Sequence, residues 1–62
     1  MPEVAEAHHE LGEVLLARGH LNAAIQHFRE AVWLKPEFEP AQQSLQRLTR
    51  GEPERLQKEL SQ

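Results

Sequence analysis

The chain has 62 residues, enough for one small domain, and no cysteine, which excludes disulfides and thiolate metal sites. Its net charge is −3, with acidic and basic residues interspersed, so it lacks the basic footprint of a protein that binds nucleic acid or an anionic membrane. It has no apolar run as long as a membrane span, and its acidic start lacks the pattern of a signal peptide, so we expect a soluble, cytoplasmic protein.

The first predicted helix runs from residue 2 or 3 to residue 17 or 18. Pro2 suits a first helical turn, and Glu3 and Glu6 favour the positive end of the helix dipole. Gly19 supplies the left-handed residue that ends many helices.

The second predicted helix begins at Asn22, a good N-cap, and ends at Leu34 or Lys35. Pro36 forbids its continuation. Residues 36–40 form the turn into a third helix over residues 40–49, with an apolar stripe at Ala41, Leu45 and Leu48.

A break at residues 51–53 separates the third helix from a tail. The tail is expected to form a short helix over residues 54–60, with Leu56 and Leu60 one turn apart.

Small and bulky residues alternate along both halves of the predicted hairpin. The first half has the order His8, Leu11, Gly12 and Leu15, and the second half has Ala24, Phe28, Ala31 and Pro36. This order resembles one tetratricopeptide repeat, a helix-turn-helix unit. The resemblance implies an all-α fold with an antiparallel helix-turn-helix over part of residues 1–50 and a tail over residues 51–62. It also implies a protein–protein interaction scaffold.

The third helix resembles the first helix of a second repeat, with Ala41 and Leu45 matching Ala7 and Leu11. Gln46 stands in the place of Gly12 and blocks the close approach of another helix. We therefore expect the third helix to be a capping helix.

Gly12 and Ala24 are expected to form a close contact between the first two helices, because helices approach closely only where facing residues lack bulk. In this interpretation Gly12→Ala is nearly neutral. The seam around the contact is expected to contain the bulky apolar residues Leu11, Val14, Leu15, Leu21, Ile25, Phe28 and Val32.

The resemblance places the partner-binding groove along the first helices of the repeats. Carried onto this chain, its residues are Glu6, His9, Glu13, Leu16 and Ala17, followed by Gln43 and Arg47. Relatives that bind chaperone tails use Lys and Asn where this chain has His9 and Glu13. We therefore expect a basic or amphipathic helical peptide in place of a carboxylate-terminated tail.

Trp33 stands where the family usually has an exposed charged residue. Tryptophan is enriched at interface hot spots, so Trp33 either contacts a partner or packs beneath the tail, with Leu56 and Leu60 as the nearest cover.

Four histidines raise the question of a metal site. His9 and Glu13 share one helix face, but a zinc site takes three or four protein ligands, and His20 and His27 show no convergence with them. We expect no metal, no cofactor and no catalysis, because the sequence has no enzymatic constellation.

A single repeat with one cap leaves part of its apolar surface uncovered, including parts of Leu15, Leu16, Ile25 and Val32. The alternative function is therefore self-assembly, with a second copy of the chain as the partner in a homodimer.

Overall fold

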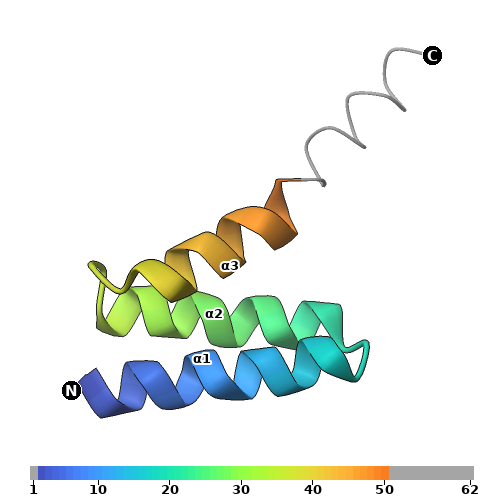
Figure 1. Ribbon diagram of the computed structural model, residues 1–62, viewed down its shortest axis with the longest axis horizontal. Helices are drawn as coiled ribbons and strands as arrows, with labels where there is room; N and C mark the ends of the chain where they lie inside the picture. The colour runs from blue at the N-terminus through green and yellow to red at the C-terminus, as the bar shows by residue number, and fades with distance from the viewer. Residues whose placement is uncertain (1, 51–62) are drawn as a thin grey trace.

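The computed structural model describes residues 2–50, which form three α-helices and no strand (Figure 1). These are α1 (Pro2–Ala17), α2 (Leu21–Leu34) and α3 (Glu39–Thr49). The all-α prediction is confirmed, and the predicted bounds of α1 agree with the structure. The predicted tail helix and its Leu56 and Leu60 lie outside the described residues.

A tight turn at Gly19 joins α1 to α2. Gly19 has φ 83°, in the left-handed region that glycine enters without steric cost. The His20 N–H donates to the Leu15 carbonyl at 2.8 Å, and the Gly19 N–H donates to the Leu16 carbonyl at 3.0 Å. This pair of bonds is the Schellman arrangement, which satisfies carbonyls that the helix end would leave without partners.

The prediction that Asn22 caps α2 is wrong. The N-cap is His20, whose carbonyl accepts the first helical bond from Ala24 N–H at 3.0 Å, and its side chain makes no capping bond. The Schellman turn explains the shift. It ends at His20, so the chain enters α2 directly and Asn22 lies inside the first helical turn.

The second connection begins where Pro36 stops α2. Lys35 N–H still bonds to Ala31, and Phe38 N–H then bonds back to Lys35 across the turn. Phe38 is the N-cap of α3, and Pro40 lies in its first turn, where a missing N–H costs nothing. The side chain of Gln42 donates to the Pro36 carbonyl and ties the start of α3 to the turn.

The core is small and rich in alanine. Its buried hydrophobic residues are Ala5, Ala24, Ile25, Phe28, Ala31 and Ala41. Phe28 is the largest side chain that is completely buried. Alanines from all three helices meet in one cluster, against which Val32 and Phe38 pack. Small side chains therefore set the helices close together, and one aromatic ring supplies most of the bulk.

The predicted Gly12–Ala24 contact needs correction, because Gly12 faces the ring of Phe28. A Cβ built on Gly12 would lie 2.6 Å from Cε1, 2.9 Å from Cδ1 and 3.0 Å from Cζ of Phe28. Ala24 is buried but is not among the nearest atoms to that position. The Phe28 ring of α2 thus lies directly on the backbone of α1 at Gly12.

The predicted seam is also only partly correct. Ile25 and Phe28 are buried, and Leu15 and Val32 are half-buried. Leu11, Val14 and Leu21 are exposed, with 45%, 49% and 44% of their surface accessible. These three residues therefore lie on faces of α1 and α2 that the other described helices leave open.

Figure 1 shows α1 and α2 side by side and antiparallel, with α3 packed on α2 and diverging from it toward its own C-terminal end. Ala41 of α3 is completely buried, while Leu45 and Leu48 are half-buried. None of the three described helices is long and apolar enough to cross a bilayer.

Gly12→Ala is expected to destabilise the protein, against the near-neutral result that the sequence suggested. Overpacking typically costs about 1–3 kcal/mol, while the better helix propensity of Ala returns about 1 kcal/mol. Urea unfolding measures the difference, and the matched background is Phe28→Leu. There the ring is gone, so Gly12→Ala should become stabilising; a stabilising effect in both backgrounds would contradict the contact.

Candidate functional site

A hollow between α1 and α3, with Phe28 at its base, is the candidate site and is termed the groove. It is lined by His9, Glu13, Leu16, Phe28, Pro40, Gln43, Ser44 and Arg47. Five of these residues were predicted from the sequence: His9, Glu13, Leu16, Gln43 and Arg47. They share the groove because His9, Glu13 and Leu16 follow each other at helical spacing on α1, as Gln43 and Arg47 do on α3.

His9 lies at the centre of the groove and has only 13% of its side chain exposed. The His9 side chain is therefore half-buried and not solvent-facing. Its ring centroid lies 5.4 Å from that of Phe28 in a tilted arrangement, and 5.5 Å from that of Phe38 in an edge-on one. Such geometries are the favourable ones for aromatic pairs. His9 therefore joins α1 to the aromatic residues of α2 and of the loop before α3.

A chain of polar contacts crosses the groove through His9. Nδ1 of His9 lies 3.0 Å from Oε1 of Glu13, and Nε2 lies 3.4 Å from the hydroxyl of Ser44. Carboxylate, imidazole and hydroxyl occur in this order in serine hydrolases. Here the hydroxyl contact is at the far limit of a hydrogen bond, and two aromatic rings hold the imidazole. We interpret the chain as a polar bridge that attaches α3 to α1.

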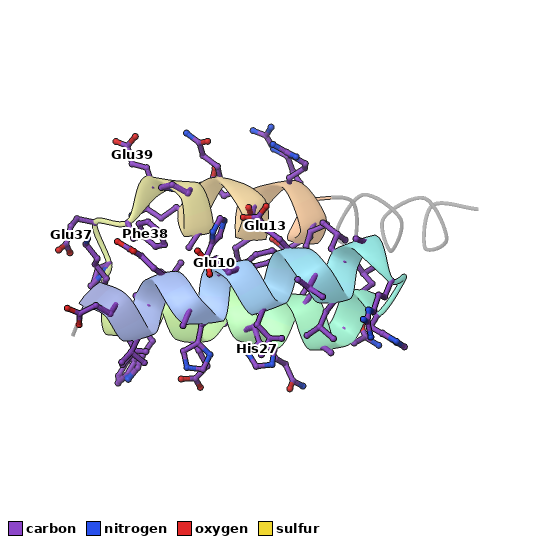
Figure 2. All side chains as sticks on the ribbon, turned by 60° about the horizontal axis from the view of Figure 1, so that its bottom comes forward. Glu10, Glu13, His27, Glu37, Phe38 and Glu39 are labelled. Atoms are coloured by element: carbon purple, nitrogen blue, oxygen red, sulfur yellow. The ribbon has the colours of Figure 1, made fainter. Side chains whose placement is uncertain are left out.

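Acidic side chains border the groove on the α1 side. Glu6, Glu10 and Glu13 follow one another at spacings of four and three residues, and all three are exposed. Figure 2 shows Glu10 and Glu13 on the side of α1 toward α3, with Phe38 between the two helices and Glu37 at the loop before α3. Arg47 is the cation that lines the groove. The rim is therefore mainly negative around a base formed by Leu16, Phe28 and Pro40.

Three other residues singled out from the sequence lie outside the groove. Glu6 is exposed one turn before His9, and Ala17 is exposed at the end of α1. Trp33 is 81% exposed. It follows buried Phe28 by five residues, which turns it to the outer side of α2.

Phe28, Pro40 and Ser44 line the groove without having been predicted there. Pro40 and Ser44 precede Gln43 and Arg47 by three residues each, so helical spacing could have identified them. Phe28 could not have been found in this way, because it lies on α2 and not on either helix that supplies the other lining residues.

A second feature missed from the sequence is the convergence of two histidines. Nδ1 of His8 and Nδ1 of His27 lie 3.1 Å apart across the seam between α1 and α2. We expected no convergence of His27 with His9 and Glu13, and the residue that it meets is His8, a pairing that was not predicted. Antiparallel packing of α1 on α2 brings together two residues that are 19 positions apart.

Comparisons with known proteins give no match, whether to a family model, to a curated protein or to a solved structure.

Titration with zinc should give no site tighter than about micromolar, near −8 kcal/mol. The reason is that the described residues contain no group of three or more His, Cys, Asp or Glu side chains placed to hold a metal. Isothermal calorimetry on the full chain measures this, and a stoichiometric nanomolar site would contradict it. His20→Ala serves as the control for weak binding by an exposed imidazole.

Proposed function

We propose that the protein is a protein–protein interaction scaffold of tetratricopeptide type, without catalytic activity. The groove between α1 and α3 binds a basic amphipathic helical segment of a partner. The observation that carries the proposal is the convergence of His9, Glu13, Leu16, Gln43 and Arg47 on one hollow, as expected from the repeat resemblance. The small buried residues Gly12, Ala24 and Ala31, together with Phe28, support the same type of repeat.

The chemistry of the groove indicates the partner. Leu16 is 37% exposed and offers an apolar contact for one face of a helix. Glu13 lies one turn before Leu16, and Glu10 and Glu6 continue along α1 toward its start, so the three carboxylates complement lysine or arginine on the adjacent face of the same helix. Trp33, on the outer side of α2, is a separate exposed anchor for a larger partner.

A synthetic amphipathic helix of leucine and lysine should bind the protein, while its counterpart with glutamate in place of lysine should not. Glu13→Gln should weaken binding by up to about fivefold, because each exposed ion pair contributes about 0.2–1 kcal/mol. Leu16→Glu should abolish binding, because it places a charge on the apolar base. Fluorescence anisotropy at low and high salt measures these effects.

Glu30→Gln is the matched control, because Glu30 lies on α2 in a different hollow with Gln26, His27 and Arg29. It removes the same charge and should leave the affinity unchanged. Equal losses for Glu13→Gln and Glu30→Gln would show that net charge alone attracts the peptide, and would contradict binding in the groove.

Self-assembly is the second candidate function, favoured by the apolar surface on α1. Val4, Leu11 and Val14 are 38%, 45% and 49% exposed. Leu11 follows His9 by two residues, about 200° around the helix, so it faces away from α3. Of the residues predicted to be partly uncovered, Leu16 is 37% exposed and Leu15 and Val32 are half-buried, while Ile25 is buried at 6% exposure.

A second copy is the occupant proposed for this surface, because the core of one chain is small. Among the described residues, only Ile25 and Phe28 of the buried hydrophobic side chains are larger than alanine. A chain of this length without disulfide or metal rarely gains enough stability from one core. Covering Leu11 and Val14 with the same surface of a second chain would add apolar burial to both copies at once.

Light scattering at about tens of micromolar should therefore report about twice the 7.2 kDa chain mass, and the Tm should rise with protein concentration. Leu11→Glu should give a monomer that still binds the leucine–lysine peptide. Leu16→Glu, the matched control on the opposite side of α1, should keep the dimer. A wild-type monomer with a concentration-independent, cooperative melt would contradict self-assembly.

A further inference from the structure

His8 and His27 meet head-on across the seam between α1 and α2. Their Nδ1 atoms are 3.1 Å apart, their ring centroids are 5.4 Å apart, and the ring planes differ by 27°. The distance between the ring centroids exceeds the distance between the Nδ1 atoms by about twice the distance from the centre of an imidazole ring to one of its nitrogens. The two nitrogens therefore lie close to the line that joins the rings, in the geometry of one hydrogen shared between two imidazoles.

This geometry requires a hydrogen on one of the two Nδ1 atoms and none on the other. One Nδ1 must carry a hydrogen and the other must offer its lone pair. The neutral pair meets the requirement when the rings adopt opposite tautomers, and the pair with one extra proton also meets it. With two extra protons both Nδ1 atoms carry hydrogen, so two N–H groups and two positive charges face each other at the distance of the present bond.

The surroundings do little to offset that repulsion. The residues one turn from His8 on α1 carry no titratable group: Val4, Ala5, Leu11 and Gly12. On α2, Arg29 and Glu30 lie in one hollow with His27, so a cation accompanies the nearby carboxylate. The helix α3 packs at Ala41 and Phe38 on the other side of the hairpin, away from His27 (Figure 2).

We propose that the His8–His27 pair is an acid-sensitive latch that holds α1 on α2 in its neutral and singly protonated forms and opens when both imidazoles are protonated. The pair lies at the level of the Gly12–Phe28 contact, since His8 is one turn before Gly12 and His27 directly precedes Phe28. Opening the latch therefore loosens the seam where the helices are closest. The inference does not depend on the proposed function of the groove.

The direction of the effect follows from counting protons. In the folded chain the hydrogen bond between the two Nδ1 atoms is lost when both rings are protonated. The unfolded chain, in which the two rings are apart, does not bear that cost, so stability falls as the pH is lowered.

A double-mutant cycle with His8→Leu, His27→Leu and the double variant tests the latch by urea unfolding of the full chain. At about pH 8, the coupling should be about fivefold in the folding equilibrium constant, as expected for one hydrogen bond, and at about pH 5 it should disappear. The other histidines are present in all four proteins, so their titration cancels. His20→Leu, at an exposed turn residue, should keep the wild-type pH dependence.

Nitrogen NMR of the histidine rings in the wild-type chain tests the same proposal without any variant. At about pH 8, one of the two rings should carry its hydrogen on Nδ1 and the other on Nε2. Hydrogen on Nε2 of both rings would overturn the latch, and so would a coupling that is equal at both pH values or absent at both.

Discussion

The contact of the Phe28 ring with the backbone of Gly12 is the constraint on which the rest of the structure depends. Because Gly12 has no side chain, the ring of α2 lies against α1 itself, at a position where a Cβ would be only 2.6 Å away. The contact draws α1 and α2 together and buries Phe28 completely. The same ring then forms the base of the groove and one wall around His9.

Much of this fold can be predicted from the sequence. Proline and glycine positions give the ends of α1 and α2 within a residue or two, and helical spacing identifies the residues that line the groove. The errors arise where the three-dimensional packing determines which residue caps a helix or which residue is buried. Asn22 is a better cap by propensity, but the turn at Gly19 uses His20. Leu11 has the hydrophobicity of a core residue, but it is 45% exposed because no other described helix covers its side of α1.

The contacts of the histidines likewise could not be predicted from the sequence. By sequence, each of the four is a separate surface or helix residue, and only the register between helices shows that two of them meet. His8 pairs with His27 because α1 and α2 are antiparallel, and His9 contacts Ser44 because α3 packs on α2 with Ser44 within reach of α1. The contacts of His9 and the alanine cluster thus join the helices around the groove, while exposed glutamates give its rim a negative charge.

The most direct test of the central contact is proton NMR of the full chain. A ring lying on the Gly12 backbone should shift the Gly12 α-proton resonances strongly upfield, and should give nuclear Overhauser effects between these protons and the ring protons of Phe28. Both signals should vanish together on unfolding in urea. Gly12 α-protons at random-coil shifts in the folded protein, with no Overhauser effect to Phe28, would contradict the account.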